Sequence, residues 1–121
     1  MALVLIVDDS PTDLHVMQQA LEQGGFRTVS AADGDEGVRM ARELHPDLIL
    51  MDIVMPGLNG FQATRQLAGD PETRAIPVIM VTSKAQESDR VWGLRQGAVD
   101  YLVKPVALDQ LLRKAQAAIA A

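Results

Sequence analysis

A run of four apolar residues, Leu48–Met51, ends at Asp52 and is followed within a few residues by the turn pair Pro56-Gly57. A short apolar run without polar alternation is typical of a parallel strand that is covered on both faces. In open α/β sheets, ligands bind at the carboxyl ends of such strands. The sequence therefore places Asp52 where this class of fold carries a functional side chain.

Helical segments alternate with strand-like segments along the rest of the chain. Ser10-Pro11, an N-cap followed by proline at the first helical position, with the acid Asp13 at the third, predicts one helix start, and Asn59 predicts another. Gly97 is expected to close a helix over Gln86–Gln96. This alternation predicts an α/β fold, a doubly wound parallel five-stranded sheet between two helical layers, with strand order 2-1-3-4-5. The other four predicted strands are Leu3–Val7, Phe26–Ala31 at the sheet edge, Val78–Val81 and Tyr101–Val103.

The composition indicates one globular domain over residues 1–121. Hydrophobic residues make up 48% of the chain and aromatic residues only 3%, so the core must be aliphatic. The net charge of −5, without a run of basic residues, argues against nucleic acid as a partner. The absence of cysteine excludes disulfides and thiolate metal sites. No apolar run reaches the ~18 residues of a membrane span, and no leader pattern precedes Leu3, so we expect a cytoplasmic protein without membrane insertion.

Polar residues follow four of the predicted strands. Asp8 and Asp9 follow the first strand, Asp52 the third, Thr82 the fourth and Lys104 the fifth. In the predicted strand order these ends share one edge of the sheet, and the three acids meet where the order reverses. Clustered carboxylates repel one another unless a cation intervenes, and their oxygens suit Mg²⁺. A hydroxyl and a lysine suit an added dianion, which indicates a site for a phosphoryl group on a carboxylate.

Four motifs make the chain similar to a known family over essentially its full length. They read VDDS at 7–10, MDIVMPGLNGF at 51–61, VTSK at 81–84 and YLVKP at 101–105. With these motifs the chain resembles the CheY-like receiver domain of bacterial two-component response regulators. The longer stretches 51–67 and 76–84 are similar to single-domain receivers of the type IV pilus (twitching) chemosensory system.

The resemblance implies a role for each acid of the predicted site. Asp8 and Asp9 match the acid pair that holds Mg²⁺, and Asp52 matches the acid that accepts a phosphoryl group from a kinase histidine. Asp52 is also a metal ligand in this reading. The backbone carbonyl of Val54, two residues past the phosphoacceptor, matches a further metal ligand. The expected phosphodonor is therefore a histidine kinase.

The resemblance also implies how phosphorylation reaches a partner. Thr82 and Lys104 match the catalytic residues that bind the phosphoryl oxygens, and Tyr101 matches an aromatic residue that changes rotamer on activation. We expect the output surface to be the face made by the fourth helix, the fifth strand and the fifth helix, which would bind a downstream protein. Trp92, on the fourth helix, fits either a core position or an exposed position on that surface. We expect a monomer and no enzymatic activity beyond self-phosphorylation from a donor and slow autodephosphorylation.

Several functions compete at this stage. The leading hypothesis is a phosphorylation-controlled switch without a separate output domain, because the chain ends after the fifth helix. The same chemistry would serve a phosphate sink that drains a shared kinase. A Mg²⁺-dependent phosphohydrolase needs an acid close after its nucleophile, where this chain has Ile53 and Val54. A flavodoxin-like flavin binder would need a hydroxyl- and glycine-rich phosphate-binding loop after the first strand. This chain has Asp8 and Asp9 there, and these acids would repel a phosphate. Receivers often carry a polar, water-orienting side chain where this chain has Val54 and Lys84, so the phosphorylated-state lifetime stays open.

Overall fold

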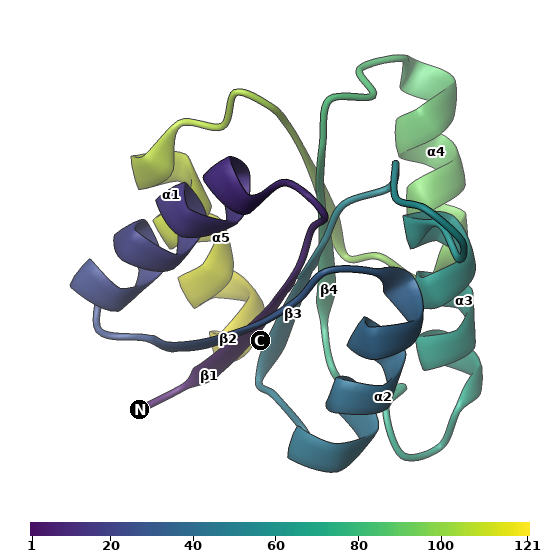
Figure 1. Cartoon of the computed structure of the whole chain (residues 1–121), viewed down its shortest axis with the longest axis horizontal. Coiled ribbons are helices and arrows are strands. Elements are labelled where there is room, and N and C mark those ends of the chain that lie inside the picture. The colour runs from purple at the N-terminus through teal and green to yellow at the C-terminus, as the bar shows by residue number, and fades with distance from the viewer.

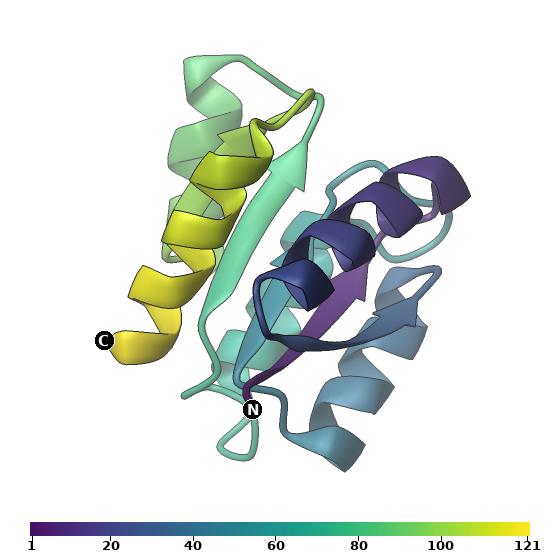
Figure 2. The ribbon, with the colours of Figure 1, turned by 90° about the vertical axis from the view of Figure 1, so that its left-hand side faces the viewer.

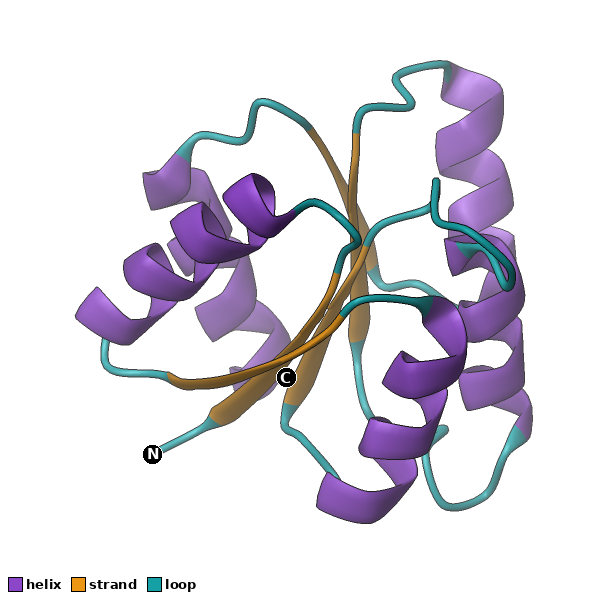
Figure 3. Ribbon diagram, in the orientation of Figure 1, coloured by secondary structure: helices purple, strands orange, loops and turns teal.

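The computed structural model describes all 121 residues and has five strands alternating with five helices (Figures 1 and 3). All strand pairs are parallel, and the sheet order is β2-β1-β3-β4-β5, so the predicted fold class and strand order are confirmed. No helix combines the length and the hydropathy that crossing a membrane requires. The elements are β1 (Leu3–Val7), α1 (Pro11–Gln23), β2 (Arg27–Ala31), α2 (Gly34–Leu44), β3 (Leu48–Met51), α3 (Gly60–Gly69), β4 (Val78–Thr82), α4 (Glu87–Gln96), β5 (Asp100–Val103) and α5 (Leu108–Ala120).

Helices cover both faces of the sheet, with α1 and α5 on one face and α2, α3 and α4 on the other (Figure 1). The apolar strands therefore have two buried faces. On β1, Val4 and Ile6 pack toward α1 and α5, whereas Leu5 and Val7 pack toward α2 and α3. Full burial of an aliphatic side chain of this size contributes about 1.5–3 kcal/mol relative to exposure. The helical partners are Met17, Leu21, Leu111 and Ala115 on the first face and Val38, Ala41, Ala63 and Leu67 on the second.

Strand register brings the polar strand ends to one edge. Val7 of β1 pairs with Met51 of β3, so the next residues, Asp8 and Asp52, leave the sheet side by side. The Asp52 N–H donates to the Val7 carbonyl at 2.9 Å, which extends the ladder by one bond. Lys104 follows β5 at the same edge. In Figure 2 the strand arrowheads point to this edge, and both chain termini lie at the opposite one.

The predicted helix signals have the expected geometry. The Ser10 hydroxyl accepts from the N–H of Asp13 at the start of α1, and Asn59 forms a reciprocal capping box with Gln62 at the start of α3. Gly97 ends α4 with φ 120°, a conformation that favours glycine. Some element boundaries shift by one residue. The edge strand begins at Arg27, α4 begins at Glu87 after its N-cap, and β5 begins at Asp100.

Gly60, the first residue of α3, packs against the backbone that carries Asp52. A Cβ on Gly60 would overlap the Asp52 carbonyl oxygen and would lie 2.7 Å from Cα of Ile53. The Gly60 N–H also donates to the Ile53 carbonyl at 2.9 Å. Because backbone rather than a flexible side chain occupies the space, the loop from β3 to α3 can pass this closely only when residue 60 lacks a side chain.

We expect Gly60→Ala to lower the free energy of unfolding by about 2 kcal/mol or more, because the backbone next to Asp52 must shift. Gly69→Ala, at the other end of the same helix, is the matched control, since its Cβ would meet no atom within 4 Å. This control should be neutral or slightly stabilising. Urea denaturation of both variants measures the difference. Equal stability of the two variants would contradict this packing argument.

Candidate functional site

Three carboxylates meet at the carboxyl edge of β1 and β3. Ligand oxygens of Asp8, Asp9 and Asp52 all lie within 4.8 Å of one another. Asp8 and Asp52 are buried, and Asp9 is exposed. The predicted convergence of these acids is therefore present in the structure. Ionised acids this close repel one another unless a cation offsets their charge or one of them takes up a proton.

Lys104 supplies the positive charge. Its Nζ donates to Asp8 Oδ2 at 2.8 Å, to Asp13 Oδ2 at 2.8 Å and to Asp52 Oδ2 at 3.1 Å. The three acceptors come from the end of β1, the first turn of α1 and the end of β3. An ammonium has three hydrogens, so these contacts use its full donor capacity. A single positive charge is therefore shared among three carboxylates, so the negative charge at the site is only partly balanced.

The protonation equilibria reflect this imbalance. Burial raises the pKa of Asp8 above its usual value, although hydrogen bonds from Lys104 and from the Ser10 N–H oppose the rise. Burial acts to lower the pKa of Lys104, but hydrogen bonds to Asp13, Asp8 and Asp52 outweigh it and raise that pKa. The lysine is thus firmly charged, whereas Asp8 gives up its proton less readily than a free aspartate does. Additional positive charge would be stabilised here.

Backbone groups fix the second oxygen of each buried acid. Asp8 Oδ1 accepts from the Ser10 N–H at 2.9 Å, and Asp52 Oδ1 accepts from the Ile53 N–H at 2.7 Å. Each of these carboxylates is therefore held by a backbone donor on one oxygen and by Lys104 on the other. This arrangement orients the Asp52 carboxylate at the surface of the site before any substrate binds.

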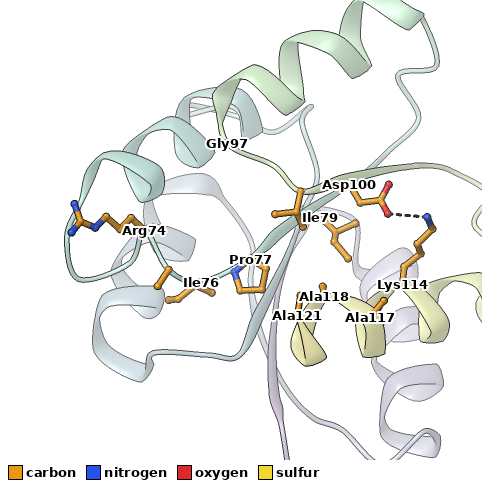
Figure 4. Close-up of a pocket in the computed structure, with 12 residues that line it drawn as sticks. Arg74, Ile76, Pro77, Ile79, Gly97, Asp100, Lys114, Ala117, Ala118 and Ala121 are labelled. Carbon is orange, nitrogen blue, oxygen red and sulfur yellow. Dashed lines mark ion pairs between the residues drawn. The ribbon is translucent and has the colours of Figure 1, made fainter.

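The acids open into a shallow depression of about 560 Å³. A depression of about 430 Å³ lies at the opposite end of the strands, between the segment Arg74–Pro77 and the end of α5 (Figure 4). Its one acid, Asp100, is already paired with Lys114 at 2.9 Å. The acid cluster distinguishes the first depression as the functional one. That depression is lined by Asp9, Ser10, Asp13, Asp52, Val54, Ser83, Lys104 and Pro105.

Comparison with known proteins agrees with this geometry. The family model described as the response regulator receiver domain matches residues 4–116. The chain belongs to the response regulator receiver family. As a receiver, it is 58% identical to Protein PilH of Pseudomonas aeruginosa over 120 residues, which cover 99% of both chains. Several other relatives are longer proteins, of which this receiver spans half or less.

Solved receiver structures have the same fold. The receiver domain of the P. aeruginosa sensor histidine kinase PA1611, with a magnesium ion coordinated in its active site cleft, superposes with a TM-score of 0.92 at 36% identity, covering 99% of this chain and 98% of that one. Chemotaxis protein CheY4 of Vibrio cholerae superposes with a TM-score of 0.91 at 30% identity, covering 98% of both chains. The cluster of Asp8, Asp9 and Asp52 is typical of a receiver Mg²⁺ site, and its oxygen donors suit that ion.

Thr82 and Tyr101 both contact the peptide groups of Lys84 in the loop after β4. The buried Thr82 hydroxyl accepts from the Lys84 N–H at 3.4 Å, and the Tyr101 hydroxyl donates to the Lys84 carbonyl at 2.8 Å. The Tyr101 ring is buried against Gly93 of α4. Burial, followed by the charges of Asp89 and Asp52, raises the pKa of Tyr101 to about 12. The Tyr101 side chain is therefore buried, with its hydroxyl held by the loop after β4.

Sequence reasoning missed the role of Asp13 at this site and did not decide whether Trp92 is buried or exposed. Asp13 was interpreted only as a helix-start acid, yet it binds Lys104 as closely as Asp8 does. Its place in the first turn of a helix that begins at the functional edge was the available signal. Trp92, which the sequence left between core and surface, is 48% exposed on α4.

Proposed function

We propose that this receiver is a phosphorylation-controlled response regulator in which Asp52 accepts a phosphoryl group from a histidine kinase. The observation that carries the proposal is the position of the Asp52 carboxylate and the contacts of its two oxygens. It lies at the sheet edge with one oxygen on a backbone N–H and the other on Lys104, beside two further acids. A pre-oriented carboxylate with compensating positive charge is what formation of an acyl phosphate requires.

In the proposed transfer, a carboxylate oxygen of Asp52 forms a bond to phosphorus while the bond from phosphorus to the histidine nitrogen breaks. The electron pair of that bond returns to the imidazole, and the product is an acyl phosphate. The Lys104 ammonium and the Thr82 hydroxyl are the donors available to the phosphoryl oxygens. Asp8, Asp9, Asp52 and the Val54 carbonyl would hold Mg²⁺, which supplies charge neutralisation during transfer.

The proposed output is a protein partner that binds the face formed by α4, β5 and α5. Four large apolar side chains are exposed on these elements, namely Val91, Trp92, Val103 and Leu108. Large apolar side chains that are exposed on neighbouring elements can contribute to a protein-binding surface. Together with the 58% identity to PilH, this supports a cytoplasmic role in type IV pilus (twitching) or chemotaxis-like signalling.

A phosphate sink is the alternative that uses the same site. A sink needs only the kinase, whereas the exposed apolar residues on α4, β5 and α5 favour a further partner. Timed phosphotransfer from a candidate kinase, with and without its other receivers, separates the two roles. A phosphohydrolase is disfavoured because the residues after Asp52, buried Ile53 and exposed Val54, carry no acid that could protonate a leaving group.

Asp52→Asn should abolish covalent phosphorylation by a small phosphodonor with Mg²⁺, because an amide of nearly the same size cannot form the acyl phosphate. Intact-mass spectrometry measures uptake, and circular dichroism checks the fold. Asp35→Asn, which changes an exposed first-turn acid of α2, is the matched control and should be labelled like the wild type. Label on Asp52→Asn at the wild-type level would show that the phosphoacceptor lies elsewhere.

Tyr101→Ala should leave phosphorylation by a small donor largely intact but weaken its effect on α4. The ring and hydroxyl of Tyr101 connect Gly93 of α4 to the Lys84 carbonyl, so their loss uncouples helix from loop. The indole N–H resonance of Trp92, the only tryptophan, reports the change by NMR. Tyr101→Phe keeps the ring contact and should retain part of the shift. If the shift on phosphorylation were the same in Tyr101→Ala as in the wild type, this residue would have no switching role.

A further inference from the structure

Asp13 is the acceptor on Lys104 that the proposed chemistry does not use. Its Oδ2 lies 2.8 Å from Nζ, whereas Oδ2 of Asp52 lies 3.1 Å away. Asp13 is not part of the acid group whose oxygens converge within 4.8 Å. Its side chain is 45% exposed, so it has no need of the lysine for its own solvation. Its presence on the ammonium therefore calls for a separate explanation.

The position of Asp13 is fixed by the start of α1. Its N–H donates to the Ser10 hydroxyl of the N-cap, and Ser10 in turn donates its own N–H to Asp8. The first turn of α1 thus brings the Asp13 carboxylate to Lys104 from a different element than the acids that follow β1 and β3. The pair of Asp13 and Lys104 also lines a second, mostly apolar cavity of about 240 Å³ between α1 and the loop after β5. The ammonium is consequently held from the helix side as well as from the sheet side.

We propose that Asp13 is a positioning residue that holds the Lys104 ammonium toward α1 and so sets the balance between cation and phosphoryl binding at the site. The inference rests on the function proposed for Asp52. With Asp13 present, the ammonium is shared and competes less strongly with a divalent cation for Asp8 and Asp52. The same sharing opposes transfer of the ammonium to a phosphoryl group, because one of its three hydrogens stays on Asp13.

This role predicts opposite changes in two affinities. Without the Asp13 charge, Lys104 should pair more fully with Asp8 and Asp52, and Mg²⁺ should bind more weakly. At saturating Mg²⁺, the freed ammonium should bind an anion at Asp52 more tightly. Because the pair is partly exposed, we expect each change to be about two- to five-fold. A merely structural role of Asp13 would weaken both affinities together.

Asp13→Asn tests the inference with two probes that do not depend on turnover. Calorimetric titration with Mg²⁺ gives the first affinity, and ¹⁹F NMR titration with beryllofluoride, a phosphoryl analogue, at saturating Mg²⁺ gives the second. Asp109→Asn is the matched control, since Asp109 is an exposed first-turn acid of α5 without an ion pair. The control should change neither affinity and thereby excludes a long-range charge effect.

The outcomes separate this inference from the function on which it rests. Weaker Mg²⁺ binding together with tighter beryllofluoride binding in Asp13→Asn, but not in Asp109→Asn, supports the positioning role when the effect on Mg²⁺ affinity disappears in a Lys104→Met background. A direct effect of the Asp13 charge would persist without the lysine and would overturn it. Unchanged affinities, two affinities that fall together, or the same changes in the control would overturn it. If the wild-type protein itself failed to bind beryllofluoride, the function proposed for Asp52 would fail, whatever Asp13 does.

Discussion

The structure of the functional edge depends on one ammonium group shared by three carboxylates. Lys104 binds Asp8, Asp13 and Asp52, and these partners come from three different elements. The lysine side chain is only 16% exposed, so its charge is screened less than that of a surface residue. Without this charge, the buried acids Asp8 and Asp52 would face each other uncompensated. The same imbalance that makes the edge costly in isolation makes it receptive to a divalent cation.

The fold provides this edge through register and close packing. Pairing of Val7 with Met51 sends Asp8 and Asp52 off the sheet together, and Gly60 lets the loop after β3 pass close behind Asp52. A chain of contacts connects Thr82 at the site to helix α4. Lys84 donates its N–H to Thr82 and accepts at its carbonyl from Tyr101, which packs against Gly93 of α4. A movement of Thr82 toward a phosphoryl group would therefore act on the backbone that anchors Tyr101.

Much of this arrangement could be predicted from the sequence because local patterns determined it. The uninterrupted run Leu48–Met51 indicated a strand with two covered faces, and Asp52 at its end indicated the functional edge. The position of Asp13 at the functional edge could be read from the sequence, but its contact with Lys104 could not, since an acid in the first turn of a helix is explained by the helix alone. Its contact with Lys104 joins residues 91 positions apart, and only the packing of α1 beside the loop after β5 creates it. The exposure of Trp92 likewise depends on tertiary packing, because Gly93 is the one buried residue of α4.

The central claim is that Lys104 and a divalent cation offset the same cluster of acids. Thermal and urea unfolding of Lys104→Met, with and without Mg²⁺, tests this most directly. Without Mg²⁺, loss of the ammonium should lower the free energy of unfolding by about 3 kcal/mol, because it leaves buried charges unpaired. Saturating Mg²⁺ should recover most of that loss, and the variant should bind Mg²⁺ more tightly than the wild type. An equal loss of stability in both conditions, with unchanged Mg²⁺ affinity, would contradict the account.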